Sequence, residues 1–180
     1  MKRQVVIIHG GEVFEDYLDY LKFLKSIKVD PYRKPFKDWK STLQEKLGNK
    51  YEVLQPSMPN KLNARYEEWR IMFEKYLPFI RKGSVLVGHS LGASFLAKYL
   101  SENKLEIKLG GIFLIAGAQY GVASFTPAFI PTGSNVWHST ADPVVPILDG
   151  LRPTRVFNGK GHFLQSTFPE LVKEIKKIAS

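Results

Sequence analysis

Short apolar runs alternate along this chain with segments of helical periodicity, and this alternation restricts the possible folds more than any other feature. Six runs rich in β-forming residues lie at residues 5–8, 51–54, 84–88, 109–117, 135–139 and 154–159. Five segments repeat apolar residues at steps of three and four, as amphipathic helices do, and they lie at residues 17–27, 39–47, 64–80, 91–102 and 169–178. Such alternation is typical of a parallel sheet whose strands are joined by crossover helices.

The runs VVII at residues 5–8 and VLV at residues 85–87 are apolar at every position. Strands of a parallel sheet have such continuous apolar sequences, because helices cover both faces of the sheet. We therefore expect an α/β protein with a mostly parallel six-stranded sheet and helices on both faces, a three-layer αβα sandwich. No repeat, low-complexity tract or linker divides the sequence, so residues 1–180 are expected to form a single domain.

The length of 180 residues and the 44% hydrophobic content are enough to bury roughly two-thirds of the unfolded surface. The N-terminal apolar run is four residues long, whereas a secretory signal needs roughly 7–15 and a membrane-spanning helix ~20. Without a cysteine in the sequence, disulfides, thiolate metal sites and cysteine nucleophiles are excluded. We expect a cytoplasmic protein with no membrane span, no metal and no cofactor.

The formal net charge is +9 at pH 7, and the positive charge is concentrated between Lys22 and Lys50. This span holds nine Lys and Arg side chains against three Asp and Glu, a surplus of six. Such a surface can attract nucleic acid, acidic lipid or an anionic substrate, or it can be a solvated face that aids solubility. No nucleic-acid-binding motif accompanies the charge, so no specific nucleic acid partner is expected.

The string GHSLG at residues 88–92 places Ser90 between an apolar strand and a segment of helical periodicity. A serine at such a turn adopts a strained backbone conformation and needs small neighbours, which Gly88 and Gly92 provide. The turn also places the hydroxyl at a helix N-terminus, where N–H groups and the helix dipole favour developing negative charge. We therefore interpret Ser90 as a nucleophile rather than as part of a structural Gly–Ser turn.

A serine hydroxyl needs a base to take its proton, and the sequence offers four histidines. His162 lies in NGKGHFLQ, a glycine-rich loop between the last strand and the last helix, from which it can reach the carboxyl ends of the strands. The side chain of His89 should diverge from the adjacent serine. His9 is expected to position the loop after the first strand, and His138 to be structural. His162 is therefore the expected general base.

The base requires a carboxylate that holds the correct tautomer and stabilises the imidazolium. Asp142 follows the run at residues 135–139 and is the expected acid. Asp149 is the rival, although it lies near a turn or a helix. The order Ser90, Asp142, His162 is the order found on α/β-hydrolase sheets.

An oxyanion hole needs two backbone N–H donors aimed at the tetrahedral oxygen, each lowering the barrier by roughly 3 kcal/mol. One donor is expected to be Leu91, directly after the nucleophile, and the other Gly11, in the HGG loop after the first strand. A phosphate-binding loop is the competing interpretation of HGG. The loop lacks both the Gly-x-Gly-x-x-Gly spacing and the Gly-Lys-Ser/Thr signature, so nucleotide binding is not favoured.

Several motifs together resemble an α/β-hydrolase without an inserted cap domain: HGG at residues 9–11, GHSLG at 88–92, the DP pair at 142–143 and GKGHF at 159–163. More narrowly, MPN at residues 58–60, EEW at 67–69, GHSLG and GHF resemble the small serine hydrolases of the retinoblastoma-binding-protein/YdeN group. The resemblance runs over essentially the whole chain. It implies the α/β-hydrolase fold and a catalytic triad of Ser90, Asp142 and His162.

The segment at about residues 13–39 is longer than this group leads us to expect between HGG and the first helix. Its apolar residues predict an extra helical or loop segment. That segment either lies near the mouth of the pocket or packs on the flank of the sheet.

The expected function is a carboxylesterase-like serine hydrolase that acts through an acyl-enzyme on small-molecule esters of small or medium acyl size. The same triad would serve a thioesterase, peptidase or acyltransferase. The alternative is a hydrolase-fold protein-binding module with weak or no catalysis. The side chains that would line the acyl pocket, or equally be ordinary core, are Phe125, Phe129, Ile130, Val144, Val145 and Phe163.

Overall fold

A six-stranded parallel sheet forms the centre of the protein in the computed structural model, which describes residues 1–119 and 123–178. The strand order is β2-β1-β3-β4-β5-β6, and each neighbouring pair is parallel. The strands are β1 (Arg3–Ile8), β2 (Tyr51–Leu54), β3 (Val85–His89), β4 (Gly111–Ile115), β5 (Ser134–Ser139) and β6 (Arg155–Phe157). The expected six-stranded parallel sheet is confirmed.

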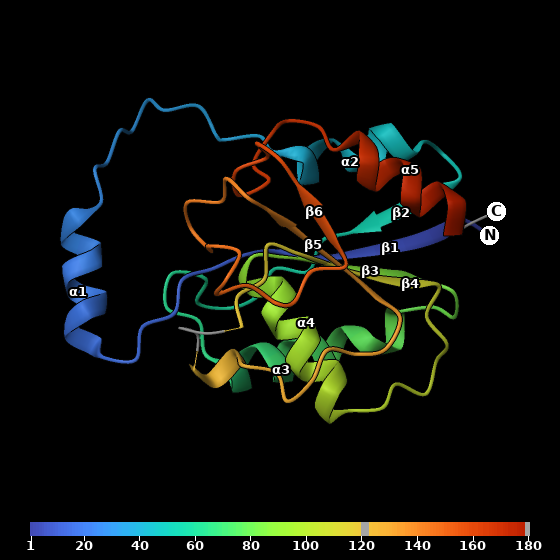
Figure 1. The fold of residues 1–180 in the computed structure, drawn as a ribbon, viewed down its shortest axis with the longest axis horizontal. Coiled ribbons are helices and arrows are strands. Elements are labelled where there is room, and N and C mark those ends of the chain that lie inside the picture. Colours follow the sequence, from blue (N-terminus) through green and yellow to red (C-terminus); the bar gives the residue numbers. More distant parts are fainter. Residues whose placement is uncertain (120–122, 179–180) are drawn as a thin grey trace.

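Helices cover both faces of this sheet, as Figure 1 shows. On one face lie α2 (Trp39–Leu47) and α5 (Pro169–Ile178), and on the other lie α3 (Tyr66–Tyr76), which a 3₁₀ turn (Leu77–Phe79) extends, and α4 (Leu91–Glu102). The residues of β1 divide between the two cores, with Val5 and Ile7 facing α2 and α5, and Val6 and Ile8 facing α3 and α4. Alternate residues of a strand point to opposite faces, so a wholly apolar strand fills two cores.

Two predicted elements end earlier than their apolar patterns suggested. The fourth strand stops at Ile115 because Ala116 has a positive φ of 51°, which an extended strand cannot contain. The helix expected over residues 64–80 breaks into α3 and the 3₁₀ turn, which contains Pro78. Proline lacks the N–H that a continuing helix requires.

The chain leaves β1 for β2 on one side and returns to β3 on the other side of β1. Ligands of open parallel sheets bind at such a reversal of strand order, beyond the carboxyl ends of the strands. The segments that follow β1 and β3 are HGG and GHSLG. The topology therefore places the two glycine-rich motifs side by side.

Residues 12–38, which we call the arm, join β1 to α2 and contain α1 (Tyr17–Ser26). In Figure 1 α1 stands apart from the other helices, beyond the carboxyl ends of the strands. None of its residues is buried. The predicted extra helix is therefore present, but it does not pack on the flank of the sheet. Within the described part of the chain, every helix is too short or too polar to cross a bilayer.

Candidate active site

Ser90 occupies a sharp turn between β3 and α4, with φ 55° and ψ −127°. Its N–H donates to the carbonyl oxygen of Ile115 at 2.8 Å, and its own carbonyl accepts from the N–H of Ala93 at 2.9 Å. The hydroxyl does not cap α4. A positive φ is unfavourable for a residue with a Cβ, and the turn is fixed by these backbone bonds rather than by the hydroxyl, which remains available to the cleft.

The turn requires a very close approach of α4 to β1. A Cβ added at Gly92 would overlap the carbonyl oxygens of Ile8 and His9. A Cβ added at Gly10 would lie 2.9 Å from the Cβ of Ser90. Glycine at both positions therefore lets the loop after β1 pass directly beside the serine.

His162 and Asp142 form a buried pair at the ends of β6 and β5. The imidazole Nδ1 lies 2.9 Å from Oδ2 and 3.0 Å from Oδ1 of Asp142. Oδ1 also accepts from the backbone N–H groups of Val144 at 2.9 Å and Val145 at 3.0 Å, and the aspartate side chain is fully buried. Because the carboxylate accepts, Nδ1 carries the proton, and Nε2 is left to accept one.

The start of α2 holds the loop that carries His162. The indole Nε1 of Trp39 donates to the carbonyl of Phe163 at 2.8 Å. The backbone N–H of Trp39 donates to the carbonyl of Gln165, also at 2.8 Å. The Nε2 of His89 donates to the carbonyl of His162 itself, also at 2.8 Å. We call Trp39, Lys40 and His89 the clamp, because together they hold the backbone at His162 and directly after it.

Lys40 completes the clamp by donating to Nδ1 of His89 at 3.3 Å. Burial lowers the pKa of His89 well below its ordinary value, and the charge of Lys40 lowers it further. Burial also lowers the pKa of Lys40, although its ion pair with Asp38 opposes this shift. A neutral imidazole is what the contacts require, since one nitrogen donates and the other accepts. The side chain of His89 was expected to diverge from the serine, whereas nothing in the sequence pattern indicated Trp39 or Lys40.

Two clefts meet at Ser90. The first, which we call the valine cleft, has a volume of about 490 Å³, and its lining includes Gly11, Leu91, Ala118, Val144, Val145, Pro146 and Asp149. The second, the histidine cleft, has a volume of about 620 Å³, and its lining includes His9, Gly10, Gly11, Lys40, Ser57, Lys61, Val144, His162 and Leu164. Ser90 and Gly11 line both. Ser90 and His162 thus line one cavity, the histidine cleft, and the valine cleft extends from Ser90 on the other side.

The two expected oxyanion donors also lie here. Leu91 is the first residue of α4, whose initial N–H groups have no acceptor within the helix. Gly11 faces it from the loop after β1, where an added Cβ would lie 3.3 Å from the leucine side chain. Leu91, Gly11 and Ser90 share the lining of the valine cleft. This is a suitable place for a developing negative charge, at the positive end of a helix dipole.

Four of the six expected pocket residues do not line either cleft. Phe125 and Phe163 are fully buried in the two cores, Ile130 packs against the core from its edge, and Phe129 is 57% exposed. Val144 and Val145 do line the clefts. The expectation was wrong for the other four because their side chains pack among the α3–α4 and α2–α5 cores or face solvent.

The remaining histidines have other contacts. His9 donates from Nδ1 to the carbonyl of Gly10 at 2.6 Å and accepts from the N–H of Met58 at 3.0 Å, and burial lowers its pKa. His138 is fully buried and accepts from the N–H of Ser139 at 2.9 Å. Among residues 1–119 and 123–178, no three His, Cys, Asp or Glu side chains gather as a metal ion would need.

The parallel sheet, its strand order and the turn at Ser90 define the α/β-hydrolase fold. Within that class the chain belongs to the serine hydrolase family, whose family model matches residues 32–143, more than half of the sequence. The family membership expected from the sequence motifs is confirmed.

Individual relatives agree with this assignment. A 61-residue stretch is 36% identical to the putative hydrolase YdeN of Bacillus subtilis, and it covers 34% of this chain and 32% of that protein. The crystal structure of the B. subtilis ydeN gene product superposes with a TM-score of 0.74 over 99% of both chains, at 21% identity. A putative YdeN-like hydrolase from Pectobacterium atrosepticum gives a TM-score of 0.68 over 99% of this chain and 91% of its own, at 13% identity.

Proposed function

We propose that this serine hydrolase is a carboxylesterase with a catalytic triad of Ser90, His162 and Asp142. The observation that carries the proposal is the buried contact between Nδ1 of His162 and Asp142, which directs the other ring nitrogen, Nε2, to act as the base in the cleft that Ser90 also lines. A serine at a strained turn, a base in the correct tautomer and a buried carboxylate are the parts that acyl transfer requires.

In the proposed acylation step, the Oγ of Ser90 attacks the ester carbonyl carbon while Nε2 of His162 removes its proton. The negative charge moves to the carbonyl oxygen, where the N–H groups of Leu91 and Gly11 stabilise it. The tetrahedral intermediate then collapses, and the imidazolium gives its proton to the departing alkoxide. The products of this step are an alcohol and an acyl ester on Ser90.

Deacylation repeats the sequence with water in place of the serine. His162 removes a proton from the water, the hydroxide attacks the acyl carbon, and the proton returns to Oγ of Ser90 as the carboxylic acid leaves. Asp142 stabilises the imidazolium in both steps. The water enters from the histidine cleft, since that cleft is where the imidazole lies.

The two clefts have different roles in this scheme. The leaving alcohol receives its proton from His162, so it occupies the histidine cleft. The acyl group then lies in the valine cleft, whose lining includes Leu91, Ala118 and Val145. The size of that cleft fits the small or medium acyl groups expected from the sequence.

Labelling with a fluorophosphonate probe tests the triad directly, because the probe reacts with an activated serine. We expect the adduct on Ser90, no labelling of Ser90→Ala, and labelling of His162→Ala slowed by at least about 100-fold. Ser57→Ala is the matched control, since Ser57 lines the same cleft. A folded wild-type protein that does not label would favour the protein-binding module instead.

The chemical class of the substrate requires a second measurement. Aryl esters graded by acyl length, a matched thioester and a peptide anilide should be compared by kcat/KM on the same preparation. We expect the esters to be the best substrates. A thioester or anilide turned over faster than every ester would replace the esterase assignment and leave the triad in place.

A further inference from the structure

The C-terminal part of the arm is unusually open to solvent. All side chains of residues 25–37, which we call the basic stretch, are exposed. The preceding helix α1 has no buried residue, and its aromatic contacts are those of Phe14 with Tyr20 and Phe23, and of Tyr17 with Tyr20. No residue of α1 or of the basic stretch belongs to either core.

Large apolar side chains recur in this exposed segment. The exposed fractions are 84% for Val29, 92% for Tyr32 and 63% for Phe36. On α1, Tyr17 is 63% and Leu18 is 64% exposed. Single exposed apolar residues are common on protein surfaces, but several of them close together indicate a binding surface for another molecule or a membrane.

The charge of the basic stretch indicates which kind of partner binds there. The stretch carries five cations and one acid, the cations being Lys25, Lys28, Arg33, Lys34 and Lys37. A second copy of the chain would present the same positive charge and be repelled. A nucleic acid would attract the cations and stack on the aromatic rings, but it would leave aliphatic side chains such as Val29 in water.

We propose that the basic stretch docks this protein on the surface of a membrane rich in anionic phospholipid. Aromatic and aliphatic side chains enter the boundary between headgroups and acyl chains, while Lys and Arg remain beside the phosphates. The arm lies beyond the carboxyl ends of the strands (Figure 1), the edge that also carries Ser90. The docking surface does not depend on the proposed esterase activity.

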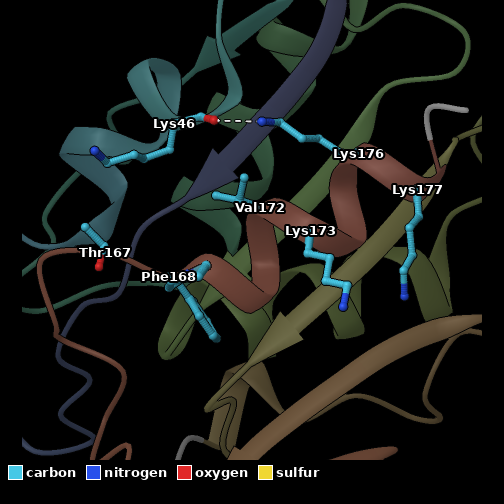
Figure 2. Close-up of a pocket in the computed structure, with 8 residues that line it drawn as sticks. Lys46, Thr167, Phe168, Val172, Lys173, Lys176 and Lys177 are labelled. Atoms are coloured by element: carbon cyan, nitrogen blue, oxygen red, sulfur yellow. Dashed lines mark hydrogen bonds between the residues drawn. The ribbon is translucent and has the colours of Figure 1, made fainter.

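A second group of cations provides an internal comparison. Lys46 of α2 and Lys173, Lys176 and Lys177 of α5 surround a hollow of about 660 Å³, shown in Figure 2. Lys176 donates to the carbonyl of Lys46 at 3.0 Å, and Lys177 pairs with Glu174. These lysines carry similar charge to the basic stretch, but no comparable set of protruding aromatic side chains accompanies them in the hollow.

Vesicle flotation tests the proposal. Wild-type protein should float with vesicles of phosphatidylcholine mixed with phosphatidylglycerol, and should bind far less to phosphatidylcholine alone. Arg33→Glu with Lys34→Glu should weaken binding by at least about 30-fold. Tyr32→Ser with Phe36→Ser should also weaken it, because the apolar contacts are lost. The matched control, Lys173→Glu with Lys177→Glu, should bind as the wild type does.

The readout does not use hydrolysis, so its result is separate from that of the probe experiment. All four residues of the arm variants are exposed, and the variants should hydrolyse a small water-soluble ester at the wild-type rate if the protein has that activity. The proposal would be overturned by equal binding to both vesicle types, by loss of binding only in the α5 control, or by tighter binding to a single-stranded oligonucleotide than to the mixed vesicles. A protein that forms a dimer in solution and does not bind either type of vesicle would also overturn the proposal.

Discussion

Asp142 and Asp149 are chemically equal carboxylates that the structure places in different surroundings. The side chain of Asp142 is fully buried and accepts from His162 and from the N–H groups of Val144 and Val145. Asp149 is exposed at the rim of the valine cleft. A buried carboxylate held by three donors orients an imidazole far better than one that water solvates.

The two aspartates should therefore respond differently to the same substitution. Asp142→Asn should lower kcat by about 10⁴-fold, because the amide donates to Nδ1 and turns the imidazole into the wrong tautomer. Asp149→Asn should have a kcat close to that of the wild type. Ser90→Ala should show the largest loss, with kcat lowered by about 10⁵–10⁶-fold. Ester hydrolysis under single-turnover conditions measures all three, and a larger loss in Asp149→Asn than in Asp142→Asn would reverse the assignment.

At the scale of elements, α2 connects the flank of the sheet to the loop after β6. Its first turn supplies two donors from Trp39 to that loop, and Lys40 reaches the loop through His89. The rings of His89 and His162 lie 5.1 Å apart. The position of the imidazole is therefore set by an element distant in sequence, rather than by the glycine-rich loop that carries it.

Trp39→Phe tests this positioning role. It removes the donor to the carbonyl of Phe163 and should lower the free energy of unfolding by about 1–3 kcal/mol. It should also lower kcat by about 10- to 100-fold with little change in KM, because the base is misplaced while the clefts remain. Trp137→Phe, in the core beside Phe113, is the control. If Trp39→Phe loses only stability, its role is structural.

The loop after β5 should control acyl length. Val145→Trp places a large side chain in the valine cleft, so kcat/KM should fall for long acyl esters and change little for acetate. Leu164→Trp, in the histidine cleft, should instead affect bulky leaving alcohols. A graded ester series measures both. The assignment of the clefts would be reversed if Leu164→Trp were the variant that excluded long acyl groups.

For the molecule as a whole, two imidazoles, the buried His89 and the half-buried His9, connect stability to pH. Burial lowers the pKa of His9 and of His89 below the ordinary value of 6.5. As the pH falls below 6.5, the unfolded chain binds protons at both sites before the folded protein does. The unfolded state is therefore stabilised relative to the folded state as the pH falls, and the free energy of unfolding decreases.

We therefore expect the urea midpoint to be constant above about pH 7 and to fall between about pH 6.5 and pH 5. His89→Gln should have a shallower decline, because its amide can still donate to the carbonyl of His162 but binds no proton. Equilibrium unfolding at several pH values measures the effect. A decline as steep in His89→Gln as in the wild type would assign the effect to other groups.

Much of the architecture could be predicted from local pattern. Wholly apolar runs such as 5–8 and 85–87 identify strands covered on both faces, and the period of three and four identifies the helices. The GHSLG motif could be placed because it lies between a strand and a helix. The strand order could not be predicted, since it depends on which side of β1 each crossover passes.

The pocket was the least predictable part. Phe125 ends a short 3₁₀ turn and Phe163 lies in a loop. An aromatic residue outside a long helix or a strand has the same sequence pattern whether it faces a cleft or a core. The clamp was invisible for a different reason, since Lys40 and His89 are 49 positions apart. Contacts between distant segments depend on the assembled layers, not on periodicity.

The lack of space for a side chain at Gly92 limits where mutations can change the substrate specificity of this protein. Because α4 rests directly on the carbonyls of Ile8 and His9, Gly92 has no room for a side chain, and Gly10 and Gly11 are nearly as restricted. A directed-evolution library should leave these glycines untouched. Its randomised positions belong in Val144–Pro146 and at Leu164, where side chains border the clefts.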